Sequence, residues 1–238
     1  MSTNTDHSLW CVVPAAGRGL RFGGELPKQY RLLGGRPLLF RTLERLAAHP
    51  RIAGLMVALA ADDPHWPGWT SLAGKPVLTC TGGAERADSV LAGLAALPAA
   101  VGADDFVLVH DAARPCVRAA DIGRLIDVAG AAEGGILACP LRDTVKRALA
   151  MPGQATPCIE ATVDRARLWR ALTPQMFRRA ALIQALESAR GSRTVTDEAS
   201  AMEALGHRPL LVEGHEDNLK VTTAADLALA EFLLERTA

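Results

Sequence analysis

The stretch LWCVVPAAGRGLRFGGELPKQY, residues 9–30, begins as an apolar run and continues into glycines and basic side chains. Residues 9–15 have the length and the continuous apolar character of a strand that is buried on both faces. Glycines after such a strand allow backbone N–H groups to approach an anion closely. The stretch therefore predicts a buried strand that opens into an anion-binding loop.

The basic residues of this loop are concentrated in a chain that is neutral as a whole. The 238 residues include 26 Lys and Arg and 26 Asp and Glu, so the formal net charge is zero. Between residues 15 and 36, however, a single acid, Glu25, stands against a cluster of basic residues. These are Arg18, Arg21, Lys28, Arg31 and Arg36. Such local clustering favours a bound phosphate over a glycine turn with solvated arginines.

Two common phosphate-binding motifs do not fit the loop. A P-loop requires Gly-Lys followed by Ser or Thr, and that tripeptide does not occur in the sequence. A dinucleotide fingerprint requires a third glycine where Phe22 follows Gly17 and Gly19, and an acid about twenty residues later, which is also missing. The loop therefore belongs to another kind of nucleotide or phosphate site.

Beyond this loop, apolar runs alternate with helical patterns along the chain. Further strands are expected at residues 54–60, 76–80, 105–111, 134–141 and 209–214. Helices are expected at residues 37–49, 87–97, 119–133, 178–189, 196–206 and 222–235. Continuous apolar strands between helices predict an α/β fold, a Rossmann-like and mostly parallel sheet with helices on both faces. Ligands of such folds bind at the carboxyl ends of the strands.

Residues 145–163 interrupt this alternation. They contain two prolines, a Pro-Gly turn and no helical stripe. A loop without regular structure is one interpretation, and a two-stranded arm that packs on a second subunit is the other. In either case we expect one domain over residues 1–238, with residues 145–163 as an excursion from it.

Composition excludes several classes of protein. Aromatic residues are 4% of the chain and there is no basic excess, which argues against a nucleic-acid partner. No apolar run approaches a membrane span, and residues 1–10 lack the features of a signal peptide, so we expect no membrane partner and a cytoplasmic location. The cysteines are odd in number and scattered, which is typical of reduced thiols. They are Cys11, Cys80, Cys116, Cys139 and Cys158.

Two later segments also fall at expected strand ends. In HDAARP, residues 110–115, adjacent strand residues face opposite sides, so His110 and Asp111 are not expected to chelate one ion together. An aspartate at the end of a buried strand either caps a turn or meets a cation. In TGGAERADSV, residues 81–90, the glycines form either a plain strand-to-helix turn or bare backbone that reads the edge of a base.

The segment PAAGRGLRFGGELPKQY resembles the A-A-G-x-G-x-R…P-K-Q signature of the sugar-nucleotide-type nucleotidyltransferases, and is most similar to the 2-C-methyl-D-erythritol 4-phosphate cytidylyltransferase family. Matching segments follow along nearly the whole chain. They are GGAERADSVLAGL, VLVHDAARPCV, RDTVKRA, TVDRARLWRALTPQMF, VTDEASAMEALG and VEGHEDNLKVTTAADLALAE. The resemblance implies CTP and a polyol phosphate as substrates, Mg²⁺ as cofactor and a homodimer built through a protruding β-arm.

The resemblance also implies roles for single residues. The nucleotide would be bound by Pro14, Ala15, Ala16, Gly17, Arg18, Gly19, Lys28, Gly82, Gly83, Ser89 and Asp111. The catalytic residues would be Arg21, Lys28, Asp111 and Lys220, with Asp111 also holding the metal. The polyol phosphate would be bound by Arg114, Thr144, Arg165 and Asp217, with Thr144 and Arg165 offered across the dimer interface and Arg114 alternatively paired with Asp111.

The chain departs from the family pattern at Ala84, where we expect an acid in close relatives, so only a backbone contact is expected there. Asp197 and Glu198 begin a helix, and we expect a capping role for them. A ribitol 5-phosphate cytidylyltransferase is the alternative enzyme. A non-catalytic nucleotide-binding module is disfavoured by the intact set of catalytic residues.

Overall fold

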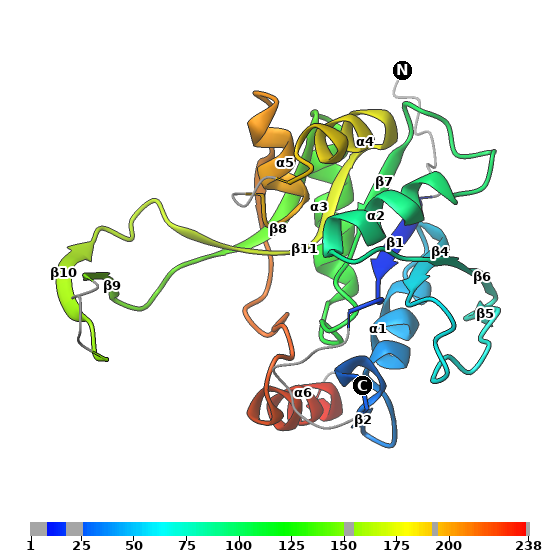
Figure 1. Ribbon diagram of the computed structural model, residues 1–238, viewed down its shortest axis with the longest axis horizontal. Coiled ribbons are helices and arrows are strands. Elements are labelled where there is room, and N and C mark those ends of the chain that lie inside the picture. Colours follow the sequence, from blue (N-terminus) through cyan, green and yellow to red (C-terminus); the bar gives the residue numbers. More distant parts are fainter. Residues whose placement is uncertain (1–8, 18–25, 150–154, 192–194, 237–238) are drawn as a thin grey trace.

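Eight strands form one central sheet in the order β12-β8-β11-β7-β1-β4-β6-β5 (Figure 1). The structure is a computed structural model that describes residues 9–17, 26–149, 155–191 and 195–236. The strands are β1 Leu9–Pro14, β4 Ile52–Leu59, β5 Ser71–Leu72, β6 Lys75–Thr81, β7 Phe106–Val109, β8 Gly134–Pro140, β11 Trp169–Arg178 and β12 Leu210–Glu213.

The sheet is mostly parallel, as the sequence predicts. β1 runs parallel to β4 and β7, β4 to β6, and β8 to β12. β11 is antiparallel to both of its neighbours, β7 and β8, and the sequence did not predict it as a strand. Pro174 lies in its middle, within a shift of register between Ala171 and Gln175. Because proline has no N–H to donate to a ladder, it is confined to such irregular positions.

The expected helices are present and cover both faces of the sheet. They are α1 Leu38–Ala47, α2 Arg86–Ala95, α3 Ala119–Gly130, α4 Arg179–Ser188, α5 Glu198–Ala204 and α6 Ala224–Arg236. Cys11 and Val13 of β1 pack in one core cluster with α1 and α3, whereas Val12 packs in another with α2, α4 and α5. Alternate residues of a strand face opposite sides, so β1 supplies both cores.

A third apolar cluster holds α6 beneath the strand ends. It joins Leu33 of the small hairpin formed by β2 (Leu32–Leu33) and β3 (Arg36–Pro37) to Ala113, Val221 and Ala230. The Val221 N–H donates to the Ala113 carbonyl at 2.8 Å. This packing brings the segment before α6 against the loop that follows β7.

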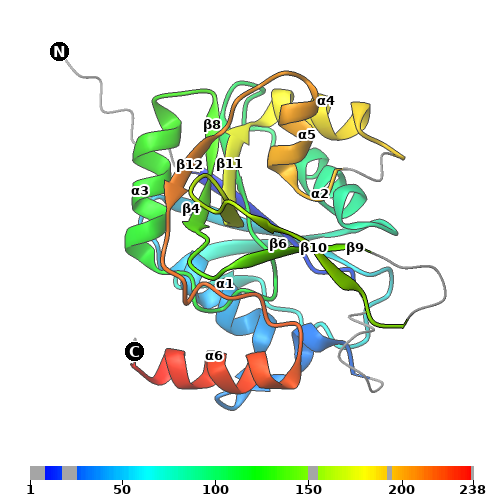
Figure 2. The same ribbon diagram turned by 90° about the vertical axis from the view of Figure 1, so that its left-hand side faces the viewer.

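The described parts of the 145–163 segment, residues 145–149 and 155–163, contain the two strands of an arm (Figures 1 and 2). β9 (Val145–Leu149) pairs antiparallel with β10 (Cys158–Val163), and the pair projects away from the sheet. The two strands rule out a loop without regular structure. Packing of the arm on a second subunit stays a prediction. Both ends of the arm leave the sheet at one place, because Pro140 of β8 and Trp169 of β11 are register partners.

All five cysteines are free thiols, and Cys11, Cys116 and Cys139 are buried. Burial raises the pKa of the Cys116 thiol to about 12, so this thiol is not a nucleophile at neutral pH. Within the described part of the chain, no helix is both long enough and apolar enough to span a bilayer.

Candidate active site

A pocket of about 280 Å³ lies where β1, β6 and β7 end, at the carboxyl edge of the sheet. Most of the nucleotide-binding residues predicted from the sequence line it together. These are Pro14, Ala15, Ala16, Gly17, Lys28, Gly83, Ser89 and Asp111, and the predicted catalytic residue Lys220 joins them. Arg18, Gly19 and Arg21 lie outside the described residues.

The first loop is tied to the short 3-10 helix η2 (Lys28–Tyr30) that follows it. The buried Gln29 amide donates to the carbonyls of Ala15 and Gly17, at 2.9 and 3.0 Å. Lys28 Nζ donates to the Val221 carbonyl at 3.1 Å, so the lysine connects the loop with the segment before α6. Sequence analysis did not assign a role to Gln29, which holds the loop carbonyls in place.

Close packing requires the two glycines of the second loop, Gly82 and Gly83. A Cβ on Gly82 would lie 2.8 Å from the Ala16 Cβ and from the Ser89 Oγ, and one on Gly83 would lie 2.2 Å from the Asp88 Cβ. Only glycine permits such close approach between the two loops. Ser89 Oγ accepts from the Gly83 N–H at 3.2 Å, which fixes the turn into α2. Ala84 lines the pocket beside them.

Asp111 is the electrostatic centre of the pocket. Its Oδ1 accepts from Arg86 Nε at 2.9 Å, and its Oδ2 lies 3.3 Å from Arg114 Nε and 3.0 Å from Lys220 Nζ. Burial by itself would raise the pKa of this carboxyl, but the charges of Arg86, Lys220 and Arg114 outweigh burial and hold its pKa far below the usual range. Asp111 is therefore ionised, and Arg114 pairs with Asp111, which is one of its two predicted partners.

Arg86 is the residue that sequence reasoning missed. Its Nη1 and Nη2 bind Glu198 Oε1 and Oε2 at 2.6 and 3.0 Å, while its Nε holds Asp111. Glu198 is fully buried, so it does more than begin α5. Asp197 has the expected capping role, because it accepts from the Ser200 N–H at 2.9 Å. Arg86 and Glu198 are 112 residues apart, and no local pattern could join them.

His110 points into the core, whereas Asp111 lines the pocket. Burial lowers the pKa of the fully buried ring to about 4, so the ring is neutral. Its Nε2–H donates to the Arg114 carbonyl, and its Nδ1 accepts from the Thr173 hydroxyl, both at 3.0 Å. The same hydroxyl accepts from the Asp111 N–H at 3.1 Å, which ties the strand end to β11.

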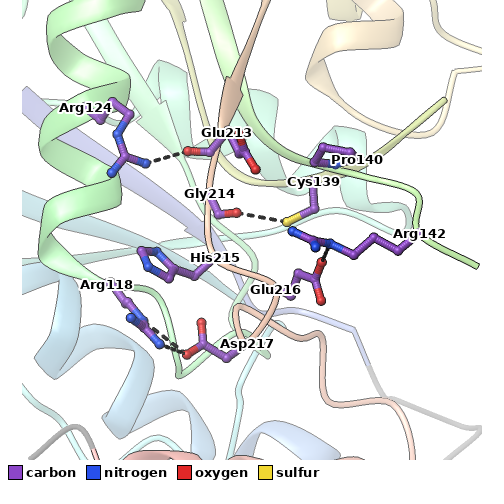
Figure 3. Close-up of a pocket in the computed structure, with 10 residues that line it drawn as sticks. All are labelled: Arg118, Arg124, Cys139, Pro140, Arg142, Glu213, Gly214, His215, Glu216 and Asp217. Atoms are coloured by element: carbon purple, nitrogen blue, oxygen red, sulfur yellow. Dashed lines mark hydrogen bonds and ion pairs between the residues drawn. The ribbon is translucent and has the colours of Figure 1, made fainter. Parts of the chain in front are cut away.

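None of the four predicted phosphate-binding residues lines this pocket. Arg114 is buried directly behind it, paired with Asp111. Asp217 pairs with Arg118 and lines a neighbouring pocket of about 660 Å³ (Figure 3). Thr144 and Arg165 are exposed and flank the strands of the arm, at the point where it leaves the sheet. Their assignment to the polyol phosphate stays a prediction.

The donor set fits one type of metal site. Among the described residues, no group of three His, Cys, Asp or Glu side chains could form a metal cage. Mg²⁺ in phosphoryl-transfer enzymes, however, is held by one or two carboxylates together with substrate phosphates and water. An ionised Asp111 in the nucleotide pocket fits a Mg²⁺ ion of this kind.

A glycine loop after the first strand, a pocket lined by Lys28 and Lys220 and an ionised aspartate at the sheet edge together define a nucleotidyltransferase. A family model described as 2-C-methyl-D-erythritol 4-phosphate cytidylyltransferase (IspD) matches residues 9–236. The chain belongs to this family.

Individual relatives agree with the family match. The Xanthomonas oryzae pv. oryzae 2-C-methyl-D-erythritol 4-phosphate cytidylyltransferase is 61% identical, over 96% of this chain and 83% of its own. The Stenotrophomonas maltophilia enzyme of that name is 60% identical, over 97% of this chain and 98% of its own. A crystal structure of the Francisella tularensis enzyme has a TM-score of 0.78 at 32% identity, covering 95% of this chain and 99% of its own. The predicted function, a cytidylyltransferase of this family, is confirmed, and the ribitol 5-phosphate alternative is not favoured.

Proposed function

We propose that the pocket around Asp111 binds CTP and transfers CMP to 2-C-methyl-D-erythritol 4-phosphate, with release of pyrophosphate. The observation that carries this proposal is the convergence of Arg86, Arg114 and Lys220 on one ionised carboxylate beside the glycine loop. Such a pocket can exchange its internal ion pairs for contacts with phosphate oxygens. Lys220 is 39% exposed, so its ammonium can turn from Asp111 towards a phosphate.

The chemistry needs positioning rather than a strong base. The attacking group is a phosphate oxygen, whose second pKa is about 6, so it is already ionised at neutral pH. The barrier comes from bringing an anion to a triphosphate and from the charge that develops on the departing pyrophosphate. The chain supplies cations and backbone N–H groups for this purpose.

The proposed roles follow the layout of the pocket. Lys28 faces the pyrophosphate, Lys220 faces the reacting phosphate, and Gly83 and Ser89 lie at the cytosine. Arg21, which is outside the described residues, would also act on the pyrophosphate. Asp111 would hold Mg²⁺, which when bound neutralises phosphate charge. Arg86 and Glu198 keep Asp111 in place.

We also propose that the arm builds a homodimer. Two apolar side chains of the arm, Leu149 and Ile159, are 46% and 68% exposed. A two-stranded hairpin on its own is marginally stable in water, so a second copy that covers these side chains would stabilise it. Thr144 and Arg165 would then reach the polyol phosphate in the partner's pocket. A cytoplasmic location belongs to the same proposal, because the five free thiols suit a reducing compartment.

The test is pyrophosphate release from the purified chain with Mg²⁺. Four nucleoside triphosphates are combined in turn with 2-C-methyl-D-erythritol 4-phosphate and with ribitol 5-phosphate. We expect release only with CTP and the methylerythritol phosphate. Faster release with ribitol 5-phosphate, or with UTP in place of CTP, would contradict the proposed substrates.

A further inference from the structure

The segment that leaves β12 crosses the start of α3 before it reaches the active site (Figure 3). Three side chains of this part of α3 hold it. Arg118, at the N-cap, pairs with Asp217, and Arg124 Nη1 donates to the Glu213 carbonyl at 2.6 Å. Between them stands Asp121.

Asp121 is fully buried and is engaged by the crossing segment. Its Oδ2 accepts from the His215 backbone N–H at 2.9 Å, and both of its oxygens lie 2.9 Å from His215 Nδ1. Arg124 Nη1 lies 3.2 Å from its Oδ1. The carboxylate also sits in the first turn of α3, where the helix dipole stabilises a negative charge. A buried carboxylate with all of these partners is a rigid attachment point.

The attached segment continues directly to the reacting groups. Asn218 follows three residues after His215, is fully buried, and donates from Nδ2 to the Thr173 carbonyl at 2.8 Å. Its own carbonyl accepts from Arg114 Nη1 at 2.7 Å. Two residues later, Lys220 Nζ meets Asp111 at 3.0 Å. The position of this lysine therefore depends on where the preceding segment is fixed.

We propose that Asp121 is a positioning residue for the transfer reaction. Together with His215 it fixes residues 213–217 on α3, so that Lys220 is held beside Asp111 and the reacting phosphate. The inference rests on the proposed role of Lys220. Asp121 itself lines neither pocket.

The first experiment replaces Asp121 in the full-length enzyme and measures both kinetic constants. Asp121→Ala should lower kcat ten- to a hundredfold, on the order expected for a reacting group displaced by about 1 Å. The KM for CTP should stay unchanged. Asp121→Asn keeps an acceptor for the His215 N–H and should recover part of the loss. The control is Asp127→Ala on the exposed side of the same helix, where turnover should match wild type.

The second experiment separates positioning from general destabilisation. If Asp121 acts through Lys220, then Asp121→Ala should cause no further loss of kcat in an enzyme that already carries Lys220→Ala. If Lys220→Ala is slow and the kcat loss of the double variant is the product of the two single losses, the inference about Asp121 is overturned, but the role of Lys220 is not. Wild-type turnover in Lys220→Ala would overturn the role of the lysine and the inference with it. If Asp121→Ala does not fold, His215→Ala and Asp121→Asn enter the same cycle.

Discussion

The pocket and the arm of this chain are built in opposite ways. In the pocket and directly behind it, Asp111, Arg114 and Glu198 are buried, and each has a partner from a distant part of the chain. In the arm, Arg147 and Glu160 are exposed and lie 3.9 Å apart, and apolar side chains face solvent. Side chains in the first region have their positions set within one chain. Those in the second are exposed, and under the proposed dimer a second subunit would set their positions.

This difference separates two kinds of functional residue. Lys28 and Lys220 can be assigned to a site from the geometry of a single chain, because pocket, partners and distances are all present. Thr144 and Arg165 are exposed and do not line the pocket around Asp111. Mutations should therefore act on the first group within a subunit and on the second group between subunits.

The largest effect is expected in the pocket. Lys28→Ala should lower kcat by a hundredfold or more, on the order observed when one preorganised donor to a developing charge is removed. Steady-state pyrophosphate release measures the loss, and circular dichroism checks the fold. The control is Arg36→Ala, since this exposed arginine belongs to the same basic cluster but does not line the pocket. Near-wild-type turnover in Lys28→Ala would contradict the pocket assignment.

The next effect tests whether the arm acts between subunits. Arg165→Ala and Lys28→Ala should each be slow, but equal mixtures that exchange subunits should regain about a quarter of wild-type activity, because half of the dimers are mixed and each mixed dimer has one complete site. The measurement is activity before and after exchange, with each variant alone as control. Failure to regain activity after demonstrated exchange would show that Arg165 serves its own subunit or no site.

Sequence reasoning succeeded where the signal is local. The apolar runs of β1 and β7 and the glycines at 82 and 83 mark the strand ends, and the pocket lies there. It failed at β11, because the proline at 174 argues against a strand, and because the place of β11 in the sheet depends on its pairing with β7 and β8. It also failed for Arg86 and Glu198, since a pair between distant segments leaves no periodic signal. Long-range ion pairs are a property of the fold rather than of any short stretch.

A smaller effect compares one ion pair from each region. Glu198→Ala removes the fully buried one of the two carboxylates that pair with Arg86 and should lower the free energy of unfolding by about 3 kcal/mol. Glu160→Ala removes the exposed partner of Arg147 and should change the free energy of unfolding by less than about 1 kcal/mol. Urea denaturation measures both. Equal losses would mean that burial does not distinguish the two regions as described.

The smallest effect concerns the pH dependence of the free energy of unfolding that His110 contributes. Burial lowers the pKa of His110 from 6.5 to about 4, so the unfolded chain binds a proton in this range more readily than the folded chain. Stability should therefore fall with pH below 6.5, and His110 alone accounts for about 2 kcal/mol of this loss by pH 5. His110→Gln should show a flatter dependence in urea denaturation between pH 7 and 5. An unchanged slope would show that the ring does not titrate as described.

The arm is an enlarged hairpin connection between two adjacent sheet strands. The Leu141 N–H already donates to the Leu168 carbonyl at 3.0 Å, so the ladder of β8 and β11 is closed without any residue between them. Insertions or deletions between these two positions leave every register of the sheet unaltered. The length and sequence of the connection can thus diverge among related enzymes while the nucleotide-binding scaffold stays the same.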